Sequence, residues 1–463
     1  MRVGMSNPQR VELRHGDCIE LMRELPDNSI DSIVTDPPYG LEFMGKEWDA
    51  PWKFGKVEWA DEGTDKSHPF RDGSARVEYG IGGTASLGFQ AWFTEVATEA
   101  LRVLKPGGHL LAFGGTRTYH RLAVAIEDAG FEIRDSMIWL YGSGFPKSHD
   151  VSKAIDKMQG AKRQKKLVQA ANPKVTGRGK SGDLSASRPF IEKALRENAG
   201  WHAVDDDTPI SSNAKQWQGW GTALKPAHEP IVVARKPLIG TVAENVLEWG
   251  VGAMNIDGCR ISGNVPSKPQ PLIRPNGKDS GHALGSGVGR NNQMSSALNG
   301  RWPANVVLSH TIFCDDTCAE GCPVAELDRQ SGIRPAGAFP EKSNVVTGKH
   351  YEGGWGVVNN GTRRITDVGG ASRFFYVAKA SKRERPKVDG VAHPTVKPLA
   401  LMRWLVRLVT PPNGTVLEPF AGSGTTVEAA LLEGFSVLAF EKTADYLPLI
   451  RERIRRTDTG VTN

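Results

Sequence analysis

The sequence predicts an α/β fold with one mostly parallel sheet, interrupted by inserted segments. Strands alternate with helices near both ends of the chain, and a small-residue turn joins a strand to a helix at residues 419–426. The middle of the chain lacks this alternation. We therefore expect a sheet built from residues 1–150, 225–240 and 374–463, with inserts at 151–224 and 241–373.

The N-terminal part gives the clearest alternation. Residues 29–35 read as a buried strand that runs directly into Asp-Pro-Pro-Tyr at 36–39. A helix is expected over 91–104, where apolar residues recur at helical spacing. The other elements predicted here are strands at 11–14, 109–115 and 131–141 and a helix at 119–129.

The C-terminal part completes the predicted sheet. Apolar residues from Leu399 to Val409 lie on one helical face. A strand at 415–417 then leads into the small-residue turn and a helix. The remaining predicted strands are 230–236, 374–378 and 436–441, the last of which ends in Glu441.

The two inserts differ in composition. The first is polar and basic, and its run Lys162, Arg163, Lys165 and Lys166 suits either contacts with phosphates or a solvated linker. The second is rich in Gly, Asn, Ser and Pro and has no helical periodicity. We expect it to be an irregular domain dominated by loops.

The overall composition sets broad limits. The 463 residues carry a net charge of +6, which permits a polyanionic partner without requiring one. No apolar run approaches the roughly 18 residues needed to span a bilayer, and the N-terminus has no apolar signal core. These features predict a soluble, cytoplasmic protein with no membrane partner. Five cysteines do not make a disulfide framework.

The turn after the strand at 415–417 has the features of a nucleotide site. A small-residue turn lets the backbone approach a ligand, and the helix that follows offers free N–H groups. Glu441, which ends the next strand, can accept hydrogen bonds from ribose hydroxyls. The turn lacks the lysine of a P-loop and the third glycine of a dinucleotide fingerprint. It fits an adenosyl cofactor, and an ordinary glycine turn is the alternative.

The segment Asp36-Pro37-Pro38-Tyr39 offers acceptors and an aromatic face. The Asp36 carboxylate and the Pro37 carbonyl can accept the two N–H groups of an exocyclic amine, which favours a pyramidal nitrogen as positive charge develops. Successive prolines hold these carbonyls in place because their φ angles are restricted. Tyr39 can stack on an extruded base. A rigid Pro-Pro turn is the alternative.

His310, Cys314, Cys318 and Cys322 form a candidate zinc site. One histidine and three cysteines make a complete tetrahedral ligand set, and their spacing falls in the range of structural zinc sites. The neighbouring Gly321 and Pro323 favour turns over a single helical stripe. The alternative is four unrelated residues with reduced thiols.

The order of the motifs, with DPPY before PFAGSG and a large insert between them, resembles the beta class of DNA amino-methyltransferases. Three further stretches match that class: HGD at 15–17, LKPGGHLLAFGG at 104–115 and HPTVKP at 393–398. The stretches TRTYHRLAVAIEDAGFEIRD, LKPAHEPIVVARKP and GRWPANVVLSH resemble its phage and prophage members. The resemblance covers the two ends, about half of the chain.

This resemblance implies a permuted, Rossmann-like methyltransferase fold with a seven-stranded, mostly parallel sheet. The protein would transfer a methyl group from S-adenosylmethionine to the N6 amine of adenine in double-stranded DNA. Asp36, Pro37, Pro38 and Tyr39 would hold the target base. Asp17, with Cys18 beside it, would contact the cofactor's adenine ring and Glu441 its ribose. His393, Thr395 and Lys397 would lie near its methionine end. The rest of the cofactor pocket would consist of Glu418, Pro419, Phe420, Ala421, Gly422, Ser423, Gly424, Thr425 and Thr426. The insert at 241–373 would recognise the target sequence.

Several alternatives stay open. Aspartate at position 36 is typical of adenine enzymes and serine of N4-cytosine enzymes, a difference that separates the two only in part. A nucleotide-dependent oxidoreductase would leave DPPY unexplained, and an inactive DNA-binding protein would not need an intact Asp36. RNA and protein-amide enzymes more often carry asparagine there. The recognition site, a partner restriction endonuclease and the oligomeric state, a homodimer included, are not given by the sequence.

Overall fold

The computed structural model describes residues 11–40, 83–142, 144, 148–163, 165–169, 201–205, 208–261, 300–311, 313–314, 317–335, 368–379 and 384–458. The chain divides into two units. One is formed by both ends of the chain, Met1–Ser143 with Ala227–Asn463, and the other is Gly144–Pro226. The insert expected at 151–224 lies inside the second unit.

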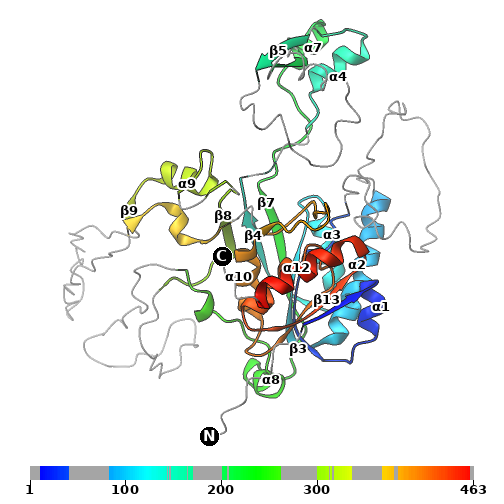
Figure 1. Ribbon diagram of the computed structural model, residues 1–463, viewed down its shortest axis with the longest axis vertical. Helices are drawn as coiled ribbons and strands as arrows, with labels where there is room; N and C mark the ends of the chain where they lie inside the picture. Colours follow the sequence, from blue (N-terminus) through cyan, green and yellow to red (C-terminus); the bar gives the residue numbers. More distant parts are fainter. Residues whose placement is uncertain are drawn as a thin grey trace, which may run out of the picture. The chain divides into compact units, whose positions relative to one another are not determined.

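A nine-stranded sheet runs through the first unit in the order β1-β13-β12-β2-β3-β7-β4-β8-β11. Every neighbouring pair is parallel except those of β7, which is antiparallel to β3 and β4. β1 and β13, from opposite ends of the chain, lie side by side (Figure 1). The strands are β1 Val11–His15, β2 Ile30–Thr35, β3 Leu104–Phe113, β4 Glu132–Leu140, β7 His228–Arg235, β8 Val306–Ser309, β11 Tyr376–Ala378, β12 Thr415–Glu418 and β13 Ser436–Glu441.

Helices cover both faces of this sheet. α1, α2 and α3 contribute to one apolar core, and α10, α11 and α12 contribute to the other. A parallel strand covered on both faces has no solvent side, which explains why all six residues of β2 are buried. The predicted α/β fold is confirmed. The helices are α1 Cys18–Arg23, α2 Gly83–Val103, α3 Tyr119–Asp128, α10 Leu399–Val409, α11 Thr425–Leu432 and α12 Leu447–Asp458.

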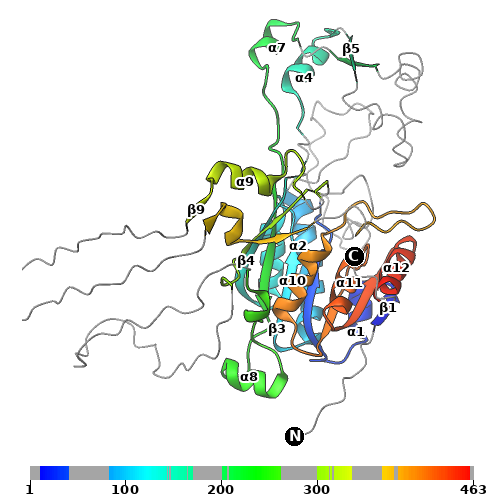
Figure 2. The same cartoon turned by 60° about the vertical axis from the view of Figure 1, so that its left-hand side comes forward.

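The sheet has two more strands than the seven we expected, and the second insert is less irregular than we expected. β8, inside that insert, pairs with β4 and β11 and so extends the main sheet. The described part of this insert also contains the α-helices α8 Val242–Trp249 and α9 Pro323–Ser331. Figure 2 shows α9 beyond β4, at this edge of the sheet. These elements are too short for periodicity to reveal among the surrounding glycines and prolines.

Among its described residues, the second unit contains the short helices α4 Val151–Met158 and α7 Ser212–Gln216 and an antiparallel strand pair, β5 Lys165–Gln169 with β6 Trp201–Asp205. Buried Asp156 lies at its centre. Its carboxylate accepts hydrogen bonds from the N–H and the hydroxyl of Ser211 and lies 2.7 Å from Arg163 Nε. Arg163 is therefore held inside the unit, which removes it from the basic run considered for phosphate contacts.

The described helices include none long and apolar enough to cross a membrane.

A buried arginine fastens α12 to the turn that precedes α11. The side chain of Arg453 is fully buried, and its guanidinium pairs with Glu428 of α11. Its Nε donates a hydrogen bond to the carbonyl of Ser423 at 2.8 Å. Removing one partner of a buried ion pair leaves the other charge without compensation.

We expect Arg453→Met to lower the free energy of unfolding by about 3–5 kcal/mol, because Glu428 would stay buried without its cation. Urea denaturation followed by circular dichroism measures this change. Arg455→Met on the same helix is the control, since its pair with Glu452 is exposed to solvent and should not affect stability measurably. Equal effects of the two substitutions would contradict this account.

Candidate functional site

A cavity of about 820 Å³ opens in the first unit where the parallel strands end. The residues that follow β1, β2, β12 and β13 all reach it, as expected for a parallel sheet whose loops meet at the carboxyl edge. β7 runs in the opposite direction, so it brings its first residues to the same edge. The cavity is lined by all the predicted catalytic and cofactor residues except Gly424.

The glycine turn between β12 and α11 is shaped by two left-handed residues. Gly422 has a φ of +51° and Gly424 a φ of +79°. A Cβ added to Gly422 would lie 3.2 Å from Nε2 of His393, and one added to Gly424 would lie 3.0 Å from Cα of Ile450. Glycine at 424 therefore permits Ile450 of α12 to pack against the turn. Glycine at 422 keeps space open on the cavity side of the turn.

Glu441 supports this turn from the end of β13. One of its carboxylate oxygens accepts the N–H of Gly422 at 2.7 Å, and the other accepts the N–H of Thr443 at 2.7 Å. Burial raises the pKa of Glu441, although these two N–H groups act in the opposite direction. Glu441 also lines the cavity.

Asp17 lies in the corresponding position after β1. Its carboxylate caps α1 by accepting the N–H of Ile19 at 3.0 Å, and it also contacts the ammonium of Lys442 at 3.0 Å. Cys18, the first residue of α1, is buried, and burial raises the pKa of its thiol. Cys18 is therefore an inert thiol in the wall.

Glu418 is buried at the floor of the cavity. It accepts hydrogen bonds from Thr35, from Thr426 and, at 3.0 Å, from the N–H of Phe420. Burial outweighs these donors and raises the pKa of Glu418 to about 8. The side chain is therefore largely protonated at neutral pH and adds little charge to the site.

The DPPY motif is held by a network around one buried ammonium. Nζ of Lys397 lies 2.6 Å from Asp36, 3.1 Å from Glu229 and 3.0 Å from the hydroxyl of Tyr39. The Tyr39 hydroxyl in turn lies 2.9 Å from Asp36 and 2.8 Å from Glu229. Burial by itself lowers the pKa of Lys397, but Asp36 and Glu229 outweigh burial and raise it. Burial and the same two carboxylates raise the pKa of Tyr39, so its hydroxyl stays protonated.

Aromatic rings form the wall beside this network. The ring centroids of Trp139 and Tyr141, at the end of β4, lie 4.8 Å apart. Nζ of Lys397 lies 5.8 Å from the centroid of Trp139. These rings give the cavity an apolar face on which a planar base can stack.

The structure brings both groups of predicted residues into one cavity. The ammonium of Lys397, which we expected near the methionine end of a cofactor, contacts Asp36 of the DPPY motif. Sequence reasoning also missed Glu229, Trp139 and Tyr141. The sequence signal for Glu229 was a carboxylate that directly precedes the apolar run PIVVA.

A protein-family profile described as DNA methylase matches residues 30–452, a range that includes both DPPY and the cofactor turn.

The chain belongs to the DNA methylase family.

Two curated relatives are similar to parts of this chain. The Type II methyltransferase M.HindIII of Haemophilus influenzae is 24% identical over 250 residues, which are 52% of this chain and 63% of that protein. The Type II methyltransferase M.BamHI of Bacillus amyloliquefaciens is 30% identical over 102 residues, 22% of this chain and 17% of that protein. The chain therefore spans less than two thirds of the length of either relative.

Among solved structures, PvuII DNA methyltransferase (cytosine-N4-specific) aligns with 98% of this chain and 94% of its own, at 11% identity and a TM-score of 0.37.

The raised pKa of Glu418 predicts how the stability of this protein depends on pH. The folded state holds a proton on Glu418 up to about pH 8, whereas the unfolded chain loses it near the ordinary value of 4.5. Folding therefore takes up a proton on Glu418 between these pH values, so this contribution to stability is complete below 4.5 and falls steadily as pH rises to about 8. Glu418→Gln, which cannot titrate, should become more stable relative to wild type as pH rises. Urea unfolding from pH 5 to 8 measures the difference, and curves that stay parallel would refute the assignment.

Proposed function

We propose that this DNA methylase transfers a methyl group from S-adenosylmethionine to the N6 amino group of adenine in double-stranded DNA. The observation that carries the proposal is that one cavity joins the glycine turn at 419–426 to the carboxylate of Asp36. Membership of the DNA methylase family and the similarity to two Type II methyltransferases support it.

The cofactor half of the cavity fits an adenosyl group. The volume of the whole cavity lies within the range of small-molecule sites, about 300–1,000 Å³. Gly422 leaves room for close approach, and Glu441 and Asp17 present carboxylates at the ends of neighbouring strands. When bound there, S-adenosylmethionine supplies an activated methyl group on its sulfonium.

The DPPY half fits an exocyclic amine. Asp36 and the Pro37 carbonyl are the acceptors we assign to its two N–H groups, and such acceptors stabilise the positive charge that develops on the nitrogen. Asp36 and Glu229 carry two negative charges against the single positive charge of Lys397, so this group of residues keeps one net negative charge. Tyr39 and Glu418 do not change this balance because both are largely neutral. The local field therefore favours a cationic reaction centre.

Lys397 also sets the position of the acceptor. Its ammonium contacts one oxygen of Asp36, and the Tyr39 hydroxyl contacts the other. Two contacts fix the plane of the carboxylate, and an acceptor with a fixed direction loses less entropy when it holds the amine. The aromatic wall of Trp139 and Tyr141 would stack on the extruded base.

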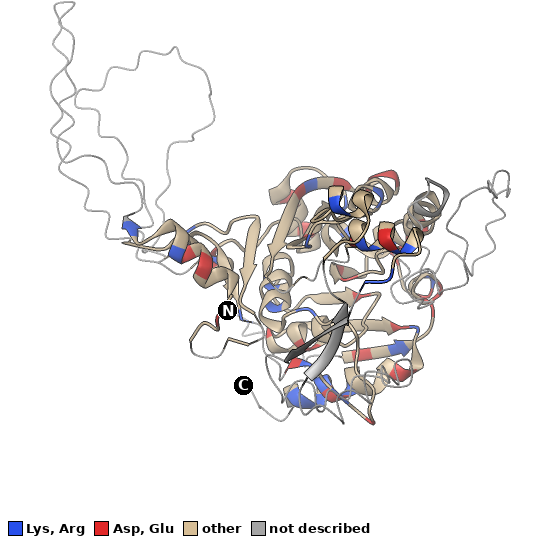
Figure 3. Cartoon of the chain, turned by 90° about the horizontal axis from the view of Figure 1, so that it is seen from above, with Lys and Arg blue, Asp and Glu red and all other residues tan. Residues whose placement is uncertain are grey.

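DNA is the proposed partner, and it would be met in the cytoplasm. Lys and Arg are interspersed with Asp and Glu along the described elements (Figure 3). Specific contacts, rather than a strong electrostatic attraction over the whole surface, would then hold the DNA. We assign target recognition to the insert at 241–373, whose β8 and α9 lie at the β4 edge of the sheet.

The two halves of the cavity should be separable by substitution. We expect Asp36→Ala to reduce methyl transfer more than a thousandfold and to leave the affinity for S-adenosylhomocysteine within a few fold of wild type. Gly422→Val should instead abolish that affinity, because a branched side chain would fill the space beside His393. Radiolabelled transfer assays and calorimetric titration measure the two quantities.

Circular dichroism controls for the fold of both variants. Turnover of Asp36→Ala within tenfold of wild type would refute the role of Asp36 in the reaction. Unchanged affinity of Gly422→Val for S-adenosylhomocysteine would refute the cofactor assignment.

A further inference from the structure

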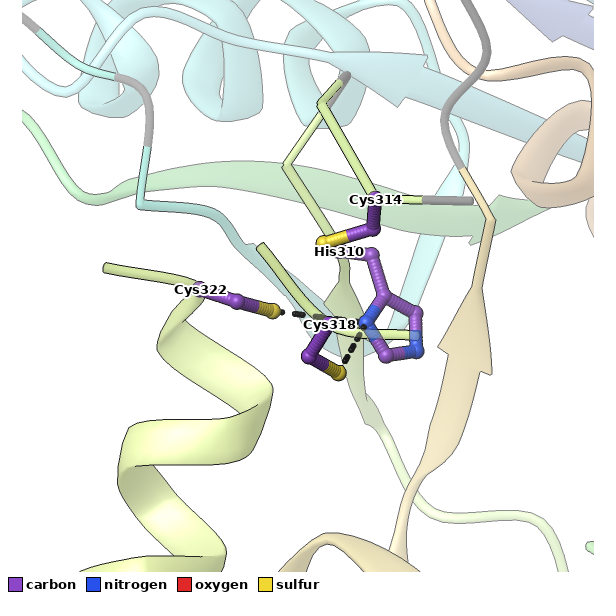
Figure 4. A group of neighbouring side chains, drawn as sticks. All are labelled: His310, Cys314, Cys318 and Cys322. Atoms are coloured by element: carbon purple, nitrogen blue, oxygen red, sulfur yellow. Dashed lines mark hydrogen bonds between the residues drawn. The ribbon is translucent and has the colours of Figure 1, made fainter. Parts of the chain in front are cut away.

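His310, Cys314, Cys318 and Cys322 lie outside the cavity and take no part in the proposed methyl transfer. Their ligand atoms, one histidine nitrogen and three sulfurs, all lie within 4.8 Å of one another, and Figure 4 shows the four side chains converging on one point. We propose that these residues bind one zinc ion and that this ion has a structural role.

The distances within the group already approach those of a zinc centre. Nδ1 of His310 lies 3.3 Å from Sγ of Cys322 and 3.5 Å from Sγ of Cys318. In a tetrahedral site with Zn–S bonds of about 2.3 Å and Zn–N bonds of about 2.0 Å, nitrogen and sulfur ligands lie about 3.5 Å apart. Small side-chain movements would therefore complete the coordination.

Three separate pieces of backbone bring the ligands together. His310 directly follows β8, and its N–H donates a hydrogen bond to the carbonyl of Ala378 in β11. Cys314 lies in a turn closed by its N–H and the carbonyl of Thr311. Cys322 immediately precedes α9. The four-residue spacing thus reflects turns, which excludes the single helical stripe that the sequence also allowed.

The surroundings of Cys314 suit a thiolate. Its sulfur accepts the N–H of Ala319 at 3.3 Å and lies 3.4 Å from the hydroxyl of Thr311. Donors of this kind stabilise the charge of a metal-bound sulfur and fix its direction.

The small core at this edge explains what a metal would contribute. Of the described residues, Leu308, Cys322 and Val324 are the buried members of this small apolar core. A core of this size supplies little stability, and a metal that joins three segments would supply more. Four protein ligands complete a tetrahedron and leave no open position for a substrate, so the geometry points to a structural ion rather than a catalytic one.

The proposed zinc site also adjoins the aromatic wall of the cavity. Ser309, the residue before His310, accepts a hydrogen bond from the indole Nε1 of Trp139 at 3.0 Å. Pro323, the residue after Cys322, packs so closely on Gly142 that a Cβ there would lie 2.7 Å from it. Zinc would therefore fix the two points that support the wall formed by Trp139 and Tyr141.

Metal analysis of the full-length protein, purified without chelators, tests the proposal. We expect one zinc per chain by elemental analysis, and we expect Cys318→Ser to lose most of it. Cys259→Ala is the matched control, since Cys259 lies in the main core, away from the cluster, and should retain the metal. Less than about one zinc per ten chains in wild type would overturn the proposal, as would undiminished zinc in Cys318→Ser.

A second variant keeps the test decisive if Cys318→Ser fails to fold. His310→Cys preserves four ligands, so after cobalt replaces zinc its visible spectrum should shift from that of a three-sulfur, one-nitrogen site to that of a four-sulfur site. An unchanged cobalt spectrum would overturn the assignment of His310.

Hydrogen exchange tests the structural role. Removing the metal should accelerate amide exchange in α9 and leave exchange in α10 unchanged. Unchanged exchange in α9 would contradict that role. None of these readouts depends on methyl transfer, so they separate failure of the zinc proposal from failure of the proposed function.

Discussion

Lys397 joins three segments that are distant in the sequence. Its buried ammonium contacts Asp36 after β2, Glu229 at the start of β7 and the hydroxyl of Tyr39. An ammonium in this position requires compensating carboxylates, because burial without a partner would force it to lose its proton. The sheet provides them by reversing β7, so that the first residues of this strand reach the edge where β2 ends. The DPPY motif can therefore keep its geometry only if the sheet order is intact.

Other side-chain contacts connect the site to the rest of the fold. Glu441 holds the glycine turn through Gly422, and Arg453 holds it from behind through the carbonyl of Ser423. The aromatic wall depends on β8, because Ser309 accepts the indole N–H of Trp139. A segment that the sequence presents as an irregular insert thus supports one wall of the cavity through the contact of Ser309 with Trp139.

The parts of this arrangement that depend on local pattern could be predicted from the sequence. The buried run 29–35, the turn at 419–426 and the acid at Glu441 each have a local signature, and the structure places all three at one sheet edge. The contact between Lys397 and Asp36 could not be predicted, because it joins residues 361 positions apart and depends on strand order. β8 was missed for a related reason: four residues carry too little periodicity, and only pairing with β4 and β11 defines the strand. Glu229 had a recognisable position, but nothing in its own strand indicates which cation it meets.

The central claim is that Asp36 and its neighbours present the exocyclic amine of adenine to a methyl donor. The most direct measurement is the identity of the methylated base. Purified protein is incubated with S-adenosylmethionine carrying a deuterated methyl group and with unmethylated genomic DNA of diverse sequence, and the digested nucleosides are analysed by mass spectrometry. The account predicts labelled N6-methyldeoxyadenosine, lost in Asp36→Ala. Labelled N4-methyldeoxycytidine alone, or no label in DNA from protein that binds S-adenosylhomocysteine, would contradict it.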